Sequence, residues 1–372
     1  MASTVYQYDR SGHIYALTDP RWRGDDGSPL MLSPIPAAHP DQIDGTQRSL
    51  WRYQAALPVD PRFRVSLGEG YTPMPVLDWD GQHIHFKLEW FNPTGSFKDR
   101  GVSVLISHLR SLGATAVLED SSGNGGSAVA CYAATAGIDA TIIAPEATST
   151  AKILQARAYG ATIRLVPGTR DEVGDAAIAL ADQIPYASHN WHPMFLQGIK
   201  TIGYEIWESL AFTAPDNVVV VAGAGSIVLG CDIAFGELAA AGLISTRPRL
   251  LVGQPEHWAT IADAVNGVPA PTQRLPTIAE GAAISRPVRL PEAVAAIKRS
   301  EGAAVRISNN EIRTATRKLA SRGLYTEPTS AVAAAALDRF ITAGTITPDQ
   351  TTVVVLTGTG LKSVAPLADI FS

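Results

Sequence analysis

Residues 91–101 read FNPTGSFKDRG and place a single lysine, Lys98, between a turn and a helix. Asn92-Pro93 and Thr94-Gly95 are dipeptides that favour turns. The apolar run that follows, VSVLISHLRSLGA (102–114), has the residue spacing of a helix. The sequence therefore predicts that Lys98 stands at a loop-to-helix junction, where its side chain points in a defined direction.

Outward from this stretch, short β-branched runs alternate with longer helix-like runs. Strand-like segments such as AVLED (116–120), NVVVVA (217–222) and TTVVVLTG (351–358) each border a glycine-rich loop. Strands that alternate with helices of this length predict βαβ units, mainly parallel sheets, and helices on both sheet faces. We therefore expect an α/β protein with two parallel-sheet domains that meet at a cleft.

The pattern also suggests domain bounds. A smaller domain is expected over residues 97–192, and a larger one is expected to combine residues 51–96 with 193–372. Residues 1–50 are rich in proline and lack periodicity, so we expect an arm that packs on a domain or on a neighbouring subunit.

Composition excludes several classes of protein. Of the 372 residues, 46% are hydrophobic and 17% are charged, with 30 basic against 35 acidic residues and no basic block that would bind nucleic acid. The two cysteines, Cys131 and Cys231, exclude a disulfide scaffold and are too few for a cysteine zinc site. We see no apolar signal segment and no run long enough to span a membrane, so we expect a soluble, cytoplasmic protein.

Three glycine-rich loops follow predicted strands, where α/β proteins bind ligands. They are SSGNGGS (121–127), AGAGS (222–226) and TGTG (357–360). In AGAGS the glycines let successive N–H groups face one point at a helix start, which suits an anion. Each loop has an ordinary alternative: tight packing for AGAGS, a surface turn for SSGNGGS and a turn hydroxyl for Thr357 of TGTG.

Lys98 changes the balance between these alternatives. A lysine amine, an anion-binding loop and polar groups that hold a flat heterocycle are the parts of a pyridoxal phosphate site. Most lysines are solvated surface residues, but the setting of Lys98 in its turn argues against that assignment.

Five segments carry a resemblance to a known family. In order along the chain they are NPTGSFKDRG, SSGNGGS, AGAGSIVLG, EPTSA and LTGTGLK. They resemble the fold type II pyridoxal phosphate enzymes and, within them, threonine synthase. The similarity extends from SLGEGYTPM, which starts at residue 66, to LTGTGLK, which ends at residue 362.

The resemblance implies a role for each matching residue. Lys98 would form the Schiff base with pyridoxal 5'-phosphate, Asn124 would bond the ring hydroxyl and Thr357 would face the ring nitrogen. The cofactor phosphate would be wrapped by Gly223, Ala224, Gly225, Ser226 and Ile227. The substrate carboxylate would be received by Ser121, Ser122, Gly123 and Gly125.

Lys200 bears on the substrate. It lies in GIKTIGYEI (198–206), which is similar to the GQKT segment of threonine synthases, whereas dehydratases of this fold tend to have GQGT. The resemblance implies that Lys200 binds a phosphorylated or otherwise anionic substrate. A lysine at a helix start can equally be solvated.

The chain departs from its family in two places. Gly125 stands where the asparagine loop usually carries threonine or alanine. The arm resembles a degenerate zinc ribbon, with Gly24 and Asp26 where thiols are expected, so we expect no metal. These differences concern the substrate more than the cofactor.

The expected chemistry centres on Lys98. A neutral hydroxyl at the ring nitrogen, Thr357, makes a weak electron sink that suits elimination and replacement, with Lys98 as base for the Cα proton. Asp99 is expected to cap the helix start. His189 and His192, in SHNWHP, are interpreted as structural, and Glu280 and Glu327 are expected to approach the ring.

Three hypotheses remain open. The first is a threonine synthase-like lyase that converts O-phosphohomoserine and water to threonine and phosphate. The resemblance implies that such an enzyme is a homodimer. The second is an ammonia-lyase, dehydratase or β-replacement enzyme acting on a serine-, threonine- or hydroxyaspartate-like amino acid. The third is a non-catalytic binding protein that kept the fold, against which the intact Lys98 argues.

Overall fold

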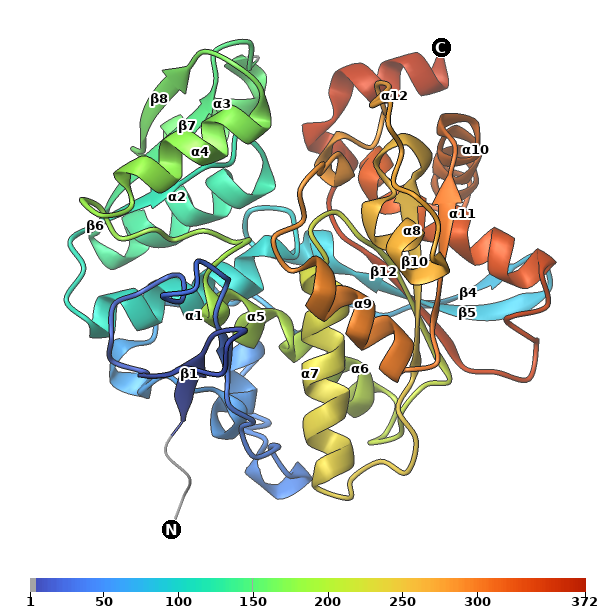
Figure 1. Ribbon diagram of the computed structural model, residues 1–372. Coiled ribbons are helices and arrows are strands. Elements are labelled where there is room, and N and C mark those ends of the chain that lie inside the picture. The colour runs from blue at the N-terminus through green and yellow to red at the C-terminus, as the bar shows by residue number, and fades with distance from the viewer. Residues whose placement is uncertain (1–4, 149) are drawn as a thin grey trace. The chain divides into compact units, whose positions relative to one another are not determined.

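The computed structural model describes residues 5–148 and 150–372, which form two compact units (Figure 1). Unit 1 comprises residues 1–69 and 98–199, and unit 2 comprises residues 70–97 and 200–372. The chain passes between the units three times. Two of these passages fall directly before a lysine, at Lys98 and at Lys200.

Unit 1 contains a parallel sheet in the order β6-β7-β8. Its strands are β6 (Ala116–Glu119), β7 (Asp139–Pro145) and β8 (Thr162–Val166). The helices that alternate with them are α2 (Asn124–Ala136), α3 (Thr150–Ala158) and α4 (Arg170–Leu180). Consecutive β7 residues face opposite sides: Ile142 lies beside α2, whereas Ile143 packs with Val173 and Ala177 of α4.

Two further helices of unit 1 cross at unusually close range. They are α1 (Lys98–Ser111) and α5 (Pro193–Ile199). A Cβ at Gly101 would lie 2.3 Å from the Phe195 ring, and a Cβ at Gly198 would lie 2.0 Å from the Arg100 carbonyl oxygen. Because no side chain fits at either position, these glycines set the distance between the two backbones.

The arm belongs to unit 1 and packs on it through Trp22. Its antiparallel sheet, β2-β1-β3, consists of β1 (Tyr6–Tyr8), β2 (Ile14–Ala16) and β3 (Met31–Leu32), and 3-10 helices follow at Pro40–Gln42, Leu50–Ala56 and Pro61–Phe63. The Trp22 ring centroid lies 5.1 Å from the ring centroids of Tyr186 and Trp191. The arm therefore contributes apolar surface to its own unit.

The positions where thiols were expected in the arm lie in a hydrogen-bond cluster around Asp9. Its carboxylate accepts bonds from the Tyr15 hydroxyl at 2.7 Å, the Ser11 hydroxyl at 2.7 Å and the His13 N–H at 3.0 Å. A Cβ at Gly24 would lie 2.4 Å from the Asp9 Cβ. Burial opposes ionisation of Asp9, but these hydrogen bonds prevail and lower its pKa to about 2.

Unit 2 is built on a six-stranded sheet in the order β11-β10-β9-β12-β5-β4. All neighbours are parallel except β4, which is antiparallel to β5. The strands are β4 (Val76–Trp79), β5 (Gln82–Leu88), β9 (Asn217–Val221), β10 (Arg249–Pro255), β11 (Ala303–Ile307) and β12 (Thr352–Leu356). The four valines of β9 are buried, as expected for a strand covered on both faces.

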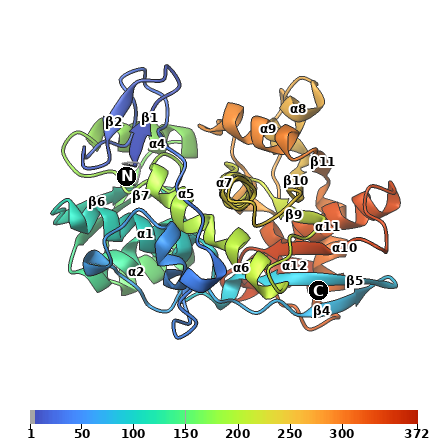
Figure 2. The same cartoon turned by 90° about the horizontal axis from the view of Figure 1, so that it is seen from below.

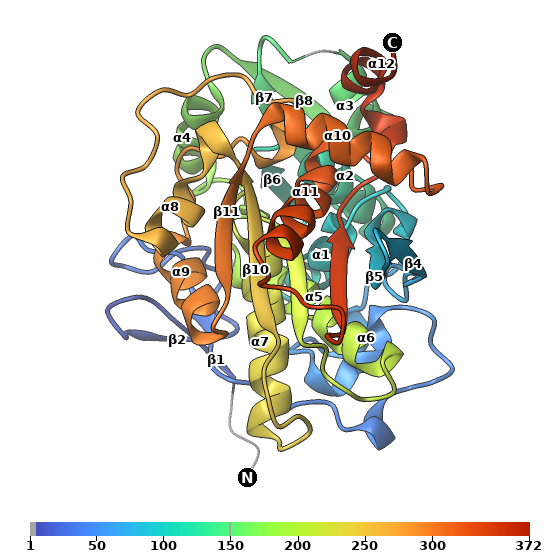
Figure 3. The ribbon, with the colours of Figure 1, turned by 90° about the vertical axis from the view of Figure 1, so that its right-hand side faces the viewer.

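Helices cover both faces of this sheet (Figure 2). One side carries α7 (Ser226–Ala240), α8 (Thr260–Asn266) and α9 (Leu290–Arg299), and the other carries α10 (Asn309–Ala320) and α11 (Pro328–Thr342). The remaining helices are α6 (Thr201–Ser209) and α12 (Val364–Phe371). Figure 3 shows α11 lying across β9, β10 and β12.

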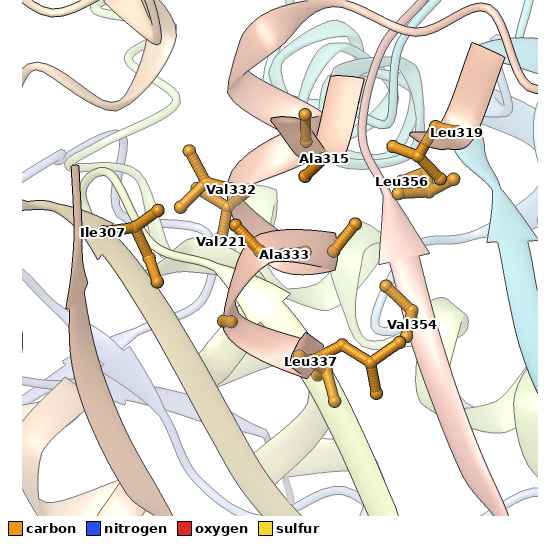
Figure 4. Packing of buried hydrophobic residues seen from close by; sticks show 14 of the residues in the cluster. Val221, Ile307, Ala315, Leu319, Val332, Ala333, Leu337, Val354 and Leu356 are labelled. Carbon is orange, nitrogen blue, oxygen red and sulfur yellow. The ribbon is translucent and has the colours of Figure 1, made fainter. Parts of the chain in front are cut away.

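The largest apolar cluster fills the space between α11 and the sheet (Figure 4). Val332, Ala333 and Leu337 of α11 face Val221 and Val354 of the sheet. The alanine-rich face lets the helix approach closely: a Cβ at Gly253 of β10 would lie 2.8 Å from the Cβ of Ala336. This packing fixes the strand ends from which the glycine loops emerge.

The predicted parallel-sheet α/β architecture is confirmed, with one antiparallel edge strand in unit 2 and a small antiparallel sheet in the arm. Across the described residues, no helix combines the length and the apolar character needed to cross a lipid bilayer.

We expect Gly198→Ala to destabilise the protein by about 1–3 kcal/mol or more, because the new methyl group collides with the Arg100 carbonyl. Gly174→Ala is the matched control. Gly174 lies inside α4 and its Cβ would meet only an ordinary contact at 3.6 Å, so this change should be neutral or stabilising. Urea unfolding of both variants measures the difference, and equal stabilities would contradict the close crossing.

We expect Asp9→Ala to lower the midpoint of thermal unfolding, because it leaves the Tyr15 hydroxyl and the His13 N–H without their acceptor. A chelator such as EDTA should leave the wild-type midpoint unchanged. A midpoint that falls on chelation would instead reveal a metal in the arm.

Candidate active site

Lys98 is the first residue of α1, which confirms the predicted loop-to-helix junction. Its side chain is half-buried, and its Nζ lies 5.3 Å from the ring centroid of Phe195. Phe195 can occupy this place because Gly101, one turn after Lys98, offers no side chain. The close helix crossing of unit 1 thus gives the lysine an aromatic support.

The SSGNGGS loop lies between β6 and α2, and Asn124 is the first residue of this 13-residue helix. Ser121 and Gly125 are buried, whereas Gly123 is exposed. A Cβ at Gly126 would lie 1.9 Å from the Ser121 carbonyl oxygen, so the loop turns too tightly for any other residue there. The structure thus gathers the four residues predicted to receive a carboxylate at a helix N-terminus.

A histidine–glutamate pair lies against this loop. His189 Nδ1 is 2.5 Å from Glu119 Oε1, and the His189 backbone N–H donates to Glu119 Oε2 at 3.2 Å. Both side chains are buried. A Cβ at Gly125 would lie 2.8 Å from His189 Nδ1, so the glycine that departs from the family pattern leaves room for the imidazole.

Burial moves the pKa values of the pair in opposite directions. It raises the pKa of Glu119 to about 8, although the His189 N–H and the charge of Lys98 oppose the rise. It lowers the pKa of His189 well below its usual value, with Lys98 adding to the effect. A raised Glu119 pKa and a lowered His189 pKa mean that, near neutral pH, the two side chains share one proton and carry no net charge together.

In unit 2, the AGAGS loop connects β9 to the 15-residue helix α7. Gly225 adopts φ 89°, a conformation that favours glycine. A Cβ at Gly223 would lie 3.1 Å from the Gly281 carbonyl oxygen. Within residues 5–148 and 150–372, the backbone N–H groups from residue 223 to residue 227 find no hydrogen-bond acceptor, so they are available to an anion.

Thr357 directly follows β12 and is buried. Its hydroxyl lies 2.9 Å from the Ser330 hydroxyl and donates to Glu327 Oε1 at 3.4 Å. Both neighbours belong to the EPTSA segment at the start of α11. Sequence reasoning named Glu327 but missed Ser330. Glu280, in contrast, is exposed and begins a 3-10 turn whose next residue, Gly281, borders the AGAGS loop.

Lys200 is fully buried in unit 2 and has a protein partner. Its Nζ donates to Glu237 Oε1 at 2.8 Å, and the Tyr204 hydroxyl donates to the other oxygen of Glu237 at 2.7 Å. Burial lowers the pKa of Lys200, while the carboxylate of Glu237 opposes the shift. These contacts favour a structural role, so substrate binding by Lys200 stays a prediction.

Sequence reasoning missed Glu119 as a site residue and interpreted His189 as structural. The available signal was the position of Glu119 at the carboxyl end of a predicted strand, where α/β proteins place functional groups. Nothing in the sequence paired it with a histidine 70 residues away.

The chain is similar to known proteins over most of its length. The model of a family described as "Pyridoxal-phosphate dependent enzyme" matches residues 65–358. A threonine synthase of Methanosarcina acetivorans is 33% identical over 333 residues, which cover 87% of this chain and 82% of the relative. A threonine synthase of Mycobacterium tuberculosis is 35% identical over 320 residues, which cover 83% of this chain and 87% of the relative.

Solved structures show the same fold at lower sequence identity. The processed form of threonine deaminase isoform 2 from Solanum lycopersicum has a TM-score of 0.71 and 22% identity, with 90% of this chain and 96% of that chain covered. Maize serine racemase has a TM-score of 0.65 and 21% identity, with 80% and 91% covered.

We expect Lys200→Ala to cost about 3–5 kcal/mol of stability, because Glu237 is left buried without its cation. Adding Glu237→Gln should recover part of the loss, since glutamine still accepts from Tyr204. Lys298→Ala, at an exposed position of α9, is the control and should change stability by less than about 0.5 kcal/mol.

Steady-state kinetics of the folded Lys200 variant decide its functional role. If Lys200 is structural, Lys200→Ala should change the KM for a phosphorylated substrate and the KM for a neutral substrate by similar factors. A rise in KM confined to the phosphorylated substrate would show instead that Lys200 contacts the substrate.

Proposed function

Because the chain belongs to the pyridoxal-phosphate dependent enzyme family, we propose that Lys98 carries the cofactor and that the protein is a threonine synthase-like lyase. The observation that carries the proposal is the identity of 33–35% to threonine synthases over more than four fifths of the chain. The fold shared with threonine deaminase and serine racemase accords with fold type II.

The chain's own groups fit this cofactor. The N–H groups of residues 223–227, which find no acceptor among the described residues, suit its phosphate. A Cβ at Gly223 would lie 3.1 Å from the Gly281 carbonyl oxygen, and a Cβ at Gly225 would lie 3.0 Å from the Ala293 Cβ, so glycine lets this loop pack closely within unit 2. We assign Asn124 to the ring hydroxyl and Thr357 to the ring nitrogen. Ser330 and Glu327 hold the Thr357 hydroxyl in one orientation.

Bound pyridoxal phosphate supplies an electron sink for negative charge at Cα. Lys98, once displaced by the substrate amine, takes the Cα proton, and the Phe195 ring beneath it limits the directions its amine can reach. Ser121, Ser122, Gly123 and Gly125 hold the substrate carboxylate at the start of α2. A substrate fixed in this way presents its Cα hydrogen to one base.

The leading reaction is the conversion of O-phosphohomoserine and water to threonine and phosphate, as the names of the relatives suggest. The second candidate is an ammonia-lyase, dehydratase or β-replacement enzyme on a serine-, threonine- or hydroxyaspartate-like amino acid. One specific observation favours it: Lys200, the cation expected for a substrate phosphate, is buried against Glu237.

We further propose a cytoplasmic homodimer. The similarity to threonine synthases supports this proposal. We assign no metal to the arm, because the Asp9 carboxylate accepts hydrogen bonds from hydroxyl and amide groups.

The covalent attachment is tested by borohydride reduction of the yellow holoenzyme followed by peptide mapping. We expect the label on the peptide that contains Lys98, and Lys98→Ala should abolish both the label and the visible absorbance. Asp99 and the rest of α1 stay unchanged in this variant, and a label on any other lysine would refute the assignment.

The substrate is tested by a screen of the purified holoenzyme that measures phosphate, ammonia, 2-oxo acid and threonine together. Phosphate with threonine identifies the leading reaction, whereas ammonia with a 2-oxo acid identifies the second candidate. Absence of visible absorbance and of all products would leave only a binding role.

A further inference from the structure

Building on the proposed function, we propose that His189, oriented by Glu119, is a second acid–base residue that exchanges a proton with the side chain of the bound substrate. Lys98 then acts at Cα, and His189 acts at the oxygen that leaves.

His189 lies against the loop that is assigned to the substrate carboxylate. A Cβ at Gly125 would lie 2.8 Å from His189 Nδ1, and the same Cβ would lie 3.0 Å from Ser121 Oγ. The imidazole and the Ser121 hydroxyl therefore border the same point of the loop assigned to the substrate carboxylate, at Gly125. The imidazole also lies against the ring that supports Lys98, since the ring centroids of His189 and Phe195 are 5.8 Å apart.

Glu119 fixes the orientation of the His189 ring. Glu119 engages Nδ1, and the His189 backbone N–H bonds to the same carboxyl group, so the ring has one fixed direction. A carboxylate on Nδ1 is the arrangement that commits Nε2 to proton transfer. Nε2 has no hydrogen-bond partner in the part of the chain that the structure describes, although His189 is only 5% exposed.

The pair holds a proton that it can pass on through Nε2. With one proton shared between Glu119 and Nδ1, Nε2 carries its own hydrogen and is a donor. When Nε2 gives up that hydrogen, the shared proton settles on Nδ1 and faces an ionised Glu119. The substrate C–O bond breaks, its electron pair leaves with the oxygen, and that oxygen takes the proton from Nε2. Solvent later restores the proton to the pair.

Other charges around the pair set when it holds its proton. Lys98 of α1 and Arg170 at the start of α4 favour proton loss, and Asp120 favours retention. Since the Glu119 pKa is raised to about 8, the donor form predominates below that pH and is lost above it. Turnover that needs the donor should therefore fall on the alkaline side.

The test separates Cα chemistry from departure of the leaving group. Exchange of the Cα hydrogen of L-2-aminobutyrate, which has no leaving group, is followed by NMR in D2O with the holoenzyme. Turnover is followed with the amino acid accepted in the substrate screen. For His189→Gln we expect exchange close to wild type and turnover lower by a factor of about 100 or more.

Matched variants protect this test against misfolding. His108→Gln replaces another buried histidine of unit 1, on α1, and should leave turnover unchanged. Gly125→Ala should reproduce the loss through the Cβ contact with Nδ1, and it should add little to His189→Gln if both act on one contact. Glu119→Gln should move the alkaline limb of the pH profile.

A readout without cofactor completes the design. In apoprotein labelled with 15N-histidine, the Nε2 signal of His189 is identified as the one that His189→Gln abolishes. This signal should report a protonated nitrogen below about pH 8. Glu119→Gln should shift the pH at which the proton is lost. A parallel fall of exchange and turnover in His189→Gln, or no fall in turnover, overturns the proposal. Failure of the Lys98 assignment is distinct, because wild type itself would then carry the borohydride label on another residue, or would lack visible absorbance and exchange.

Discussion

The site in unit 1 depends on a close contact between two helix backbones. Gly101 and Gly198 leave no side chain between α1 and α5, so the Phe195 ring occupies the space next to Gly101. Lys98, one turn earlier on α1, lies over that ring, and the His189 ring packs against the same ring in an edge arrangement. Any added methyl group at the crossing forces the helices apart, and the lysine and the imidazole then lose their common support.

Buried charge is handled differently in the two units. In unit 2, Lys200 and Glu237 form a buried ion pair to which Tyr204 adds a hydrogen bond, and Lys87 is paired with Glu205 in the same way. Such pairs fix geometry, because each partner left alone would be a charge away from water. In unit 1, Glu119 and His189 share a single proton and carry no net charge together. The neutral Glu119–His189 pair can release its proton at moderate pH. The Lys200–Glu237 ion pair does not do so, because loss of the lysine proton would leave the Glu237 charge without its partner.

The departure of Gly125 from the family pattern has a physical explanation in this arrangement. A threonine or alanine at that position would bring its Cβ to 2.8 Å from His189 Nδ1. His189 in this position therefore requires glycine at this point of the loop. The same reasoning links Gly24 to Asp9 in the arm, where a Cβ would lie 2.4 Å from the Asp9 Cβ. In both places glycine is needed because a neighbouring polar residue occupies the volume that a side chain would require.

The sequence by itself determined the βαβ alternation, the loop-to-helix position of Lys98 and the glycine loop before α7, because these follow from local periodicity and backbone preference. Its resemblance to a family indicated the cofactor. Only the tertiary structure decided that Lys200 faces Glu237 and that His189 faces Glu119. Those pairings join residues far apart in the chain, and burial, which sets their charge, is a property of the packed fold rather than of any local pattern.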